Sequence, residues 1–373
     1  MKLISRKYQP GDEVQINRMY NMITGRSRTL SEYEWEWLKT WYGMGFMWLL
    51  FDTERPENDQ FIAQYSLLPV PFSIWGESYL AGKTENCMCH PDYRGKVYVP
   101  HEERSFNEAK EIFDLFFTTT GNVSGGKVGA VRRKMGYVSF DSWVYYIRFL
   151  GNSSLNDGET NMPFGKKVPL PNLIITLLSF YSKLFPKNIF DSHLELYSAE
   201  DTPLEEIEQF WRQNRQFYGI TVDRTAAYLN WRINQSPHAK YRYLIHRENG
   251  LISGYAIIFK DKAHIIHIAD IVSGKQDTRI IGTLIKGMVA LATREGAKAI
   301  SFSTTGGNGR LGRIFLSNGF ISTSFFNYMR ELLKEVDRKQ FHVYIPKKYK
   351  DIKEINNPKF WYMTDLVKEG IVQ

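Results

Sequence analysis

The chain has 373 residues, of which 43% are hydrophobic and 24% are charged. These proportions are typical of an ordinary globular protein and exclude a disordered or collagen-like chain. The 48 Lys and Arg residues exceed the 40 Asp and Glu residues, and the net charge of +8 suits a phosphorylated ligand without requiring a nucleic acid. At about 100–200 residues per domain, the length predicts two domains with separate cores.

The N-terminus, the longest apolar stretch and the cysteines exclude further classes. The first residues contain no apolar core followed by a cleavage site, so we expect no secretory signal. The apolar stretch at 173–185 contains polar residues and is shorter than the roughly 20 residues of a membrane-spanning helix. Cys87 and Cys89 are too few for a zinc site or a disulfide framework. The sequence therefore predicts a cytoplasmic protein without a metal ion or a membrane partner.

The first half begins with an expected strand at 2–8, and a turn at Pro10-Gly11 leads into a helix from Asp12, whose carboxylate suits an N-cap. A tryptophan-rich helical stretch at 33–41 follows, and its aromatic rings are expected to pack in the core. The pattern then predicts strands at 46–51, 61–68 and 84–90, a helix ending near 109, a strand ending near 119, a helix at 126–135 and a strand at 138–147.

The second half repeats this order after a polar, Pro-punctuated linker at 151–192. The tight turn at 248–250, Glu-Asn-Gly, is expected to join two adjacent strands. The elements predicted here are strands at 194–198, 241–247, 252–260, 263–272 and 299–304, helices at 204–216, 222–233, 278–294 and 308–317, and closing strands to about 345. Strands that first pair antiparallel and then alternate with helices predict an α/β (α+β) fold with a mixed sheet.

Three segments recur in the same order. Residues 62–68 resemble 252–258, with Tyr65 and Tyr255 in matching positions; a Thr-Thr-Gly run at 119 recurs at 304, and 126–137 aligns without gaps to 309–320. One short match is expected by chance, but three in order favour an internal duplication. We therefore expect an N-terminal domain at 1–150, a linker with a docking helix at 151–192 and a C-terminal domain at 193–373.

The run His90-Pro91-Asp92-Tyr93-Arg94-Gly95-Lys96, placed after an expected strand, resembles the phosphate-binding loop of the GNAT acyltransferase superfamily, written Arg/Gln-x-x-Gly-x-Gly/Ala. Such a loop holds a pyrophosphate because consecutive backbone N–H groups at a helix N-terminus face the anion. Asn308 and the pair Gly319-Phe320 fit the outer spacing of a second signature of that superfamily, and the opening strand with Pro-Gly-Asp is similar to a GNAT start. The resemblance covers nearly the whole chain, once per half.

The resemblance implies two GNAT-like domains, each with a mixed, mostly antiparallel sheet, and an acyl group carried by coenzyme A. The strand at 85–89 would pair its backbone with the pantetheine arm, and one of its N–H groups would face the thioester oxygen. A glycine-rich segment at 118–127 would bring further amides and a lysine to the ligand. The residues implied to bind the carrier are Cys87, Met88, Cys89, Arg94, Gly95, Lys96, Val97, Asn122 and Lys127.

The sequence also departs from the superfamily pattern. Val97 and Val99 occupy the glycine positions of the first-half loop, and Asp277 begins the second-half loop where a basic or amide residue is expected. The tyrosine that often protonates the departing thiolate is absent from both halves, where Arg132 and Phe315 take its place by spacing. Each half is therefore degenerate, and the family's acid is not carried over.

Two carboxylates are candidates for the general base. Asp270 lies within an otherwise apolar expected strand, where an acid is costly unless it is paired or hydrogen-bonded. It could deprotonate the substrate ammonium, or it could pair with His267 or a nearby arginine for structure. Glu85 occupies the corresponding expected strand of the first half.

Doubled GNAT folds of this divergent kind resemble three groups of enzymes: sugar N-acyltransferases, peptidoglycan-bridge aminoacyltransferases that use aminoacyl-tRNA, and tandem acetyltransferases of aminoglycosides. The HPDYRGK motif and the YLNWR motif at 228–232 favour the first group. The expected reaction is transfer from acyl-CoA to the amino group of a nucleotide-linked, for example dTDP-linked, amino-deoxysugar. We expect a monomer without a nucleic-acid partner. The alternatives are the aminoacyl-tRNA enzyme and a degenerate, non-catalytic binding module.

Overall fold

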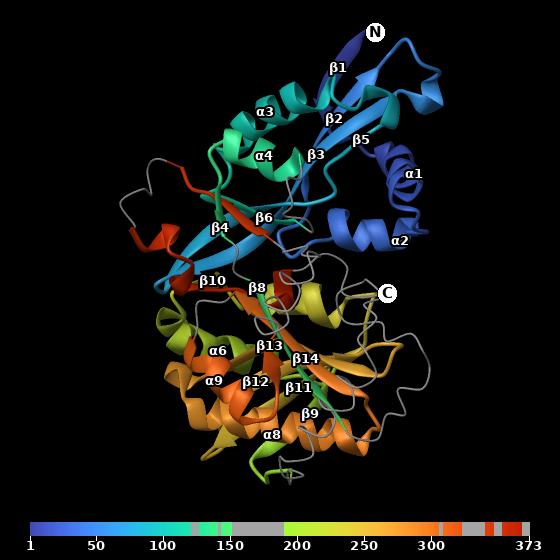
Figure 1. The fold of residues 1–373 in the computed structure, drawn as a ribbon. Coiled ribbons are helices and arrows are strands. Elements are labelled where there is room, and N and C mark those ends of the chain that lie inside the picture. Colours follow the sequence, from blue (N-terminus) through green and yellow to red (C-terminus); the bar gives the residue numbers. More distant parts are fainter. Residues whose placement is uncertain are drawn as a thin grey trace, which may run out of the picture.

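The computed structural model describes residues 1–120, 127–140, 143–150, 190–305, 309–322, 340–346 and 353–367. Within these residues the chain forms two mixed sheets, each flanked by helices and one placed beyond the other along the molecule (Figure 1). The expected α/β class with two mixed, mostly antiparallel sheets is confirmed. Most pairs of neighbouring strands are antiparallel. Along its main path each sheet contains a single parallel pair, β4–β6 in the first and β13–β14 in the second.

The first sheet has the strand order β1-β2-β3-β4-β6-β16-β7, with β5 and β10 paired to β3. The elements that the first half contributes are β1 (Leu3–Lys7), α1 (Asp12–Thr24), α2 (Leu30–Tyr33), β2 (Phe46–Asp52), β3 (Phe61–Ile74), β4 (Glu77–Thr84), β5 (Met88–Cys89), α3 (Tyr98–Ala109), β6 (Leu115–Thr120), α4 (Lys127–Lys134), β7 (Val138–Phe140) and β8 (Trp143–Phe149). Helices α3 and α4 lie together on one side of this sheet (Figure 1).

The second sheet has the order β9-β11-β12-β13-β14-β8-β15. The elements from the second half are β9 (Leu194–Ser198), α6 (Leu204–Asn214), β10 (Ile220–Val222), α7 (Ala226–Leu229), β11 (Tyr241–Glu248), β12 (Leu251–Lys260), β13 (Ile265–Ser273), α8 (Thr278–Arg294), β14 (Ala299–Thr305), α9 (Gly309–Ser317), β15 (Ile321–Ser322), β16 (Gln340–Tyr344) and β17 (Trp361–Tyr362). The core of this half is formed by apolar side chains from the sheet, α6 and α8.

The two halves exchange strands: β10, β16 and β17 of the second half belong to the first sheet, and β8 of the first half belongs to the second. Strand β8, from the first half, lies between β14 and β15 of the second sheet, and β16, from the second half, lies between β6 and β7 of the first. The expected single strand at 138–147 is therefore wrong, because β7 and β8 pair in different sheets. The division into domains at 1–150, 151–192 and 193–373 remains a prediction, and most of the linker, 151–189, lies outside the described residues.

In each half the parallel pair of strands separates beside a bulge. Strand β4 stays in register with β6 as far as Lys83, and β13 stays in register with β14 as far as Ile268. Just beyond, Leu67 of β3 pairs with Thr84, and Gln64 of β3 pairs with Met88. These pairs are three residues apart on β3 but four apart on the other side, so one extra residue bulges within 85–87. Strand β13 has its extra residue between Ile268 and Asp270. The expected continuous strand at 84–90 is thus interrupted, and both bulges lie where the sheet opens.

A reciprocal tryptophan contact joins the halves. Helices α2 and α7 each begin after a threonine that caps them, Thr29 and Thr225, and each continues into a π-helical turn, at Glu34–Leu38 and Asn230–Asn234. Trp35 Nε1 donates to the Trp231 carbonyl over 3.0 Å, and Trp231 Nε1 donates to the Trp35 carbonyl over 2.9 Å. The two rings stack with their centroids 5.7 Å apart. The matching tryptophans of the two repeats, Trp35 and Trp231, therefore contact each other where the halves meet, and this contact is called the tryptophan seam below.

The described residues contain neither a candidate membrane-spanning helix nor a candidate metal site. None of the helices there combines the length and apolar character that crossing a membrane requires. No group of three His, Cys, Asp or Glu side chains within the same residues is arranged to hold a metal ion.

Candidate active site

Strand β5 lies at the opening of the first sheet with one edge paired. Its Met88 pairs with Gln64 of β3, and the N–H of His90 donates to the carbonyl of Ile62. Because strand residues alternate in the direction of their backbone groups, Cys87 and Cys89 direct theirs toward the opposite edge. Among the described residues, β3 is the only strand that pairs with β5. The structure thus directs the backbone groups of two expected carrier-binding residues, Cys87 and Cys89, to an edge without a strand partner among the described residues.

The loop after β5 carries the expected phosphate-binding residues into the N-terminus of α3. Arg94, Gly95 and Lys96 are exposed there, and Gly95 has a positive φ of 77° that a side chain would strain. No side chain caps α3, and its first turn contains no acidic residue. The first N–H groups of a helix have no partner within it. Pro100 has no N–H and that of His101 bonds to the Val97 carbonyl, so Tyr98 and Val99 supply the donors at this terminus, beside two cations. Val97 instead packs into a small apolar cluster with Cys89.

Glu85 lies at the bulge and is buried together with Lys83. The Lys83 ammonium donates to its carboxylate over 2.6 Å, and both side chains are less than 5% exposed. Burial raises the pKa of Glu85, although the charges of Lys83 and of Arg232 from the second half act in the opposite direction. A carboxylate with a raised pKa is a stronger base than an exposed one, so this group has the chemistry of a proton acceptor.

Asp270, at the bulge of the second half, is fully buried, and its carboxylate accepts three hydrogen bonds. Arg224 Nε and the terminal Nη2 of the same guanidinium donate to its two oxygens over 2.7 and 2.9 Å, and the Thr364 hydroxyl donates over 3.0 Å. His267 does not pair with it, because that ring contacts Asp261 and Ser301. Of the two structural pairings considered from the sequence, the one with an arginine is the one that the structure contains.

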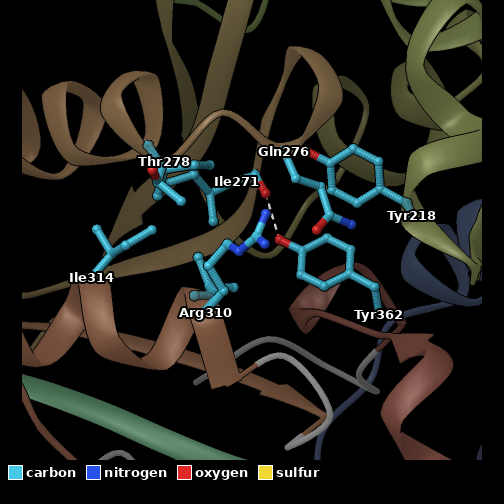
Figure 2. Close-up of a pocket in the computed structure, with 9 residues that line it drawn as sticks. Tyr218, Ile271, Gln276, Thr278, Arg310, Ile314 and Tyr362 are labelled. Carbon is cyan, nitrogen blue, oxygen red and sulfur yellow. Dashed lines mark hydrogen bonds between the residues drawn. The ribbon is translucent and has the colours of Figure 1, made fainter.

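The second half satisfies the strand edge that the first half leaves open. The Tyr218 hydroxyl donates to the Ser273 carbonyl over 2.8 Å and accepts from the Ser273 N–H over 2.7 Å. The Tyr362 hydroxyl donates to the Ile271 carbonyl, as the dashed line in Figure 2 marks. The first turn of α8 is likewise capped, because the Asp277 carboxylate accepts from the Arg279 N–H over 2.8 Å. Sequence reasoning found Asp277 but missed both tyrosines, since their contacts come from distant elements.

A shallow pocket, partly open to solvent, lies between β13, the start of α8 and α9. Figure 2 shows Arg310, from the first turn of α9, directed toward the tyrosine side of this pocket. The remaining lining is largely apolar, so the pocket combines a cation with an apolar wall. The lining residues are Tyr218, Ile271, Gln276, Thr278, Ile281, Arg310, Leu311, Ile314 and Tyr362. Sequence reasoning did not single out Arg310, although it lies in the repeated segment at 309–320.

The C-terminal segment fills the opening between β13 and β14. The Thr305 N–H donates to the Met363 carbonyl over 3.0 Å, and its hydroxyl donates to the Trp361 carbonyl over 2.7 Å. Ser303 bonds to Asp365, and Thr364 reaches Asp270 from the same segment. The opening of the second sheet is thus occupied by the protein itself.

The remaining expected site residues are placed as follows. Arg132, in the position of the missing tyrosine, is buried and forms an ion pair with Glu102 of α3. Phe315 stacks on Phe302 with centroids 4.7 Å apart and belongs to the second core. Asn122 lies outside the described residues. Lys127 begins α4, but its side chain also lies outside them.

Comparison with known proteins identifies the fold. A protein from Enterococcus faecalis, described as a probable N-acyltransferase, superposes with a TM-score of 0.62 at 12% identity, over 92% of this chain and 72% of that one. The chain has a GCN5-related N-acyltransferase (GNAT) fold. A GCN5-related N-acetyltransferase from Anabaena variabilis gives a TM-score of 0.57 at 11% identity, over 92% of this chain and 73% of that one. Yeast N-myristoyltransferase, from Saccharomyces cerevisiae with bound myristoyl-CoA, gives 0.55 at 12%, over 92% and 82%. No protein-family model and no curated protein sequence matches the chain.

Proposed function

We propose that this protein is an acyl-CoA-dependent N-acyltransferase that binds the carrier in its first half. The observation that carries the proposal is the outer edge of β5, which has no strand partner within the described part of the chain and leads directly into the N-terminus of α3, where no side chain forms a cap. Three solved structures with this fold are described as N-acyltransferases of proven or probable kind, and one of them holds myristoyl-CoA. The free edge suits an extended pantetheine arm, and the helix N-terminus suits the pyrophosphate.

The contrast between the halves supports the choice of the first. A ligand with amide and phosphate groups gains most where the protein's own donors and acceptors are unsatisfied. In the second half Tyr218, Tyr362 and Asp277 already occupy the corresponding groups. In the first half the exposed Arg94 and Lys96 add two cations for charge-assisted hydrogen bonds to phosphate.

The proposed reaction is direct attack of the acceptor amine on the thioester. The amine nitrogen forms a C–N bond with the carbonyl carbon, a backbone N–H at the bulge stabilises the oxyanion, and the C–S bond then breaks. Glu85 accepts the amine proton, and coenzyme A leaves as a thiolate that takes a proton from water. We assign the base to Glu85 because the oxygens of Asp270 are held by Arg224 and Thr364. Holding both substrates in place supplies much of the rate.

The proposed acceptor is the amino group of a nucleotide-linked amino-deoxysugar. The net charge of +8 suits a diphosphate-linked substrate. An amine flanked by sugar oxygens is less basic than lysine, so a single carboxylate is sufficient to deprotonate it.

Calorimetric titration with coenzyme A tests the carrier site. We expect Arg94→Ala and Lys96→Ala each to weaken binding about tenfold, the value of one charged hydrogen bond. Arg310→Ala and Lys275→Ala, at the corresponding end of the second half, are matched controls that should bind as the wild type does. Loss of binding in the control variants alone would move the site to the second half.

Release of thiol from acetyl-CoA in the presence of dTDP-linked amino-deoxysugars tests the reaction. We expect acceptor-dependent release that Glu85→Gln slows about a hundredfold. A protein that neither binds coenzyme A nor releases thiol with any of these acceptors would be a non-catalytic module.

A further inference from the structure

An arginine directly precedes the threonine that caps α2 and the threonine that caps α7. It is Arg28 in the first half and Arg224 in the second, and in both halves the tryptophan of the seam follows seven residues later. The Arg224 guanidinium donates to Asp270 at the bulge of the second half. The repeat therefore predicts that Arg28 reaches the bulge of the first half.

Arg28 does reach that bulge, and it contacts Asn86. Arg28 Nη1 donates to the Asn86 amide oxygen over 3.0 Å, and Trp37 Nε1 donates to the same oxygen over 2.9 Å. The Arg28 guanidinium also donates to the Glu36 carboxylate over 2.8 Å and to the Asn17 amide oxygen over 2.7 Å. Arg28 and Trp37 are both buried. Two buried donors thus hold one side chain of the bulge.

The backbone of Asn86 determines where the next N–H group points. Asn86 has a positive φ of 50°, which is uncommon for a residue other than glycine. Its carbonyl accepts a hydrogen bond from Gln64 Nε2 on β3 over 3.2 Å. In a planar trans peptide unit the carbonyl and the N–H point in opposite directions. The N–H of Cys87, which belongs to the same peptide unit, therefore points away from β3, toward the edge of β5 that has no strand partner among the described residues.

We propose that Asn86 is a positioning residue for acyl transfer and that Arg28 and Trp37 hold it in place. It fixes the peptide unit whose N–H, on Cys87, binds the oxyanion formed from the thioester. The inference rests on the proposed function and names the side chains that orient its oxyanion donor. A residue with strained φ keeps that conformation only where its surroundings enforce it. A donor that is oriented in advance needs no reorganisation when negative charge develops in the transition state.

The partners of Arg28 also leave the proposed base free of an arginine. Glu36 is the counterion of Arg28, and the carboxylate of Glu85 accepts from Lys83 instead. In the second half Arg224 binds the bulge acid directly. Arg28 therefore orders the bulge without neutralising the acid that lies in it.

Steady-state thiol release from acetyl-CoA, with a dTDP-linked amino-deoxysugar as acceptor, tests the proposal. Trp37→Phe removes one donor to Asn86, so kcat should fall about fivefold, the rate equivalent of one hydrogen bond. Asn86→Gly removes the acceptor of both bonds, and glycine adopts this φ without strain, so kcat should fall about thirtyfold. The KM for acetyl-CoA and the affinity for free coenzyme A should stay as in the wild type.

The double variant shows whether the two residues act through the same contact. Once Asn86 is glycine, Trp37 has no amide oxygen to hold, so the double variant should have the kcat of Asn86→Gly alone. Trp41→Phe is the matched control, because Trp41 Nε1 donates over 2.7 Å to the Pro69 carbonyl rather than to the bulge. Its kcat should equal that of the wild type.

Melting curves show which variants are folded, and Asn86→Gly decides the result if Trp37→Phe does not fold. A kcat of Asn86→Gly within twofold of the wild type would overturn the positioning role while leaving the proposed function intact. The same conclusion would follow from a double variant whose loss is the product of the two single losses, or from an equal fall in Trp41→Phe. A wild-type protein that releases no thiol would instead overturn the proposed function, and this inference with it.

Discussion

The two halves of this molecule each place a buried acid at a bulge where the sheet opens, and the two acids have different partners. In the first half Glu85 is paired with a lysine two residues away on its own strand, and its pKa is raised by burial. In the second half Asp270 accepts hydrogen bonds from Arg224, which follows β10, and from Thr364, which follows β17. This difference in partners is the reason why we propose Glu85, and not Asp270, as the general base.

The strand edges repeat this contrast. The edge of β5 has no strand partner among the described residues, whereas two tyrosine hydroxyls satisfy the corresponding edge of β13. The helix that follows is uncapped in the first half and capped by Asp277 in the second. These differences in capping and strand pairing, rather than the shared fold, are the basis for proposing the carrier site in the first half.

The largest loss of folding stability is expected when Asp270 loses its arginine partner. Arg224→Ala leaves Asp270 buried without its cation, and removing one member of a buried ion pair costs about 3–5 kcal/mol of the free energy of unfolding. Urea denaturation measures this loss. A loss of unfolding free energy below about 1 kcal/mol would show that Asp270 does not stabilise the fold through Arg224, and its contrast with Glu85 would no longer hold.

Substitution of the proposed base, Glu85, should lower the rate of the reaction. Glu85→Gln keeps the shape of the side chain but cannot accept a proton, so kcat should fall about a hundredfold, as for loss of a general base. Asp270→Asn should lower stability yet keep kcat per folded molecule within about threefold of the wild type. Steady-state kinetics at matched fractions of folded protein compare the two, and equal losses of kcat would contradict the assignment.

The tryptophan seam predicts a smaller and symmetric effect. Trp35→Phe and Trp231→Phe each delete one buried Nε1 donor and leave a carbonyl without its partner, at about 1 kcal/mol each. Denaturation curves of both variants should shift by similar amounts. A large difference between them would show that the seam is not equivalent in the two halves.

The smallest effect concerns pH. Burial lowers the pKa of His101 on α3 below its ordinary value of 6.5, although a hydrogen bond with the Trp48 carbonyl acts in the opposite direction. The folded state therefore resists protonation, and its stabilising contribution is present above pH 6.5 and is lost as the pH falls below that value. His101→Gln should flatten this part of the curve of unfolding free energy against pH. An unchanged slope would exclude His101 as its source.

Local sequence signals predicted most elements of the fold. The Glu-Asn-Gly turn lies between β11 and β12, with positive φ at Asn249 and Gly250, as a tight hairpin requires. The residues of α8 and β14 were predicted to within a residue or two, because amphipathic periodicity and burial are encoded locally. The assignment of β7 and β8 to different sheets was not predictable, since it depends on the distant strands with which each of them pairs.

The candidate site was predictable only in part, for the same reason. A loop motif identified Arg94, Gly95 and Lys96 as exposed residues before a helix, and the structure describes them there. The closure of the second half by Tyr218 and Tyr362 depends on segments far apart in the chain, and no spacing in the sequence announces it. The same holds for the ion pair of Glu102 and Arg132, which α3 and α4 form only when packed on the sheet.

The exchange of β8 and β16 has a consequence for any attempt to divide the molecule. A fragment that ended before residue 151 would keep β8 without its neighbours and would leave a missing inner strand between β6 and β7. The complementary fragment would lack the strand between β14 and β15. Neither piece could close its hydrogen-bond ladder alone, so we expect the two pieces, if produced separately, to be recovered in folded form only when they are refolded together.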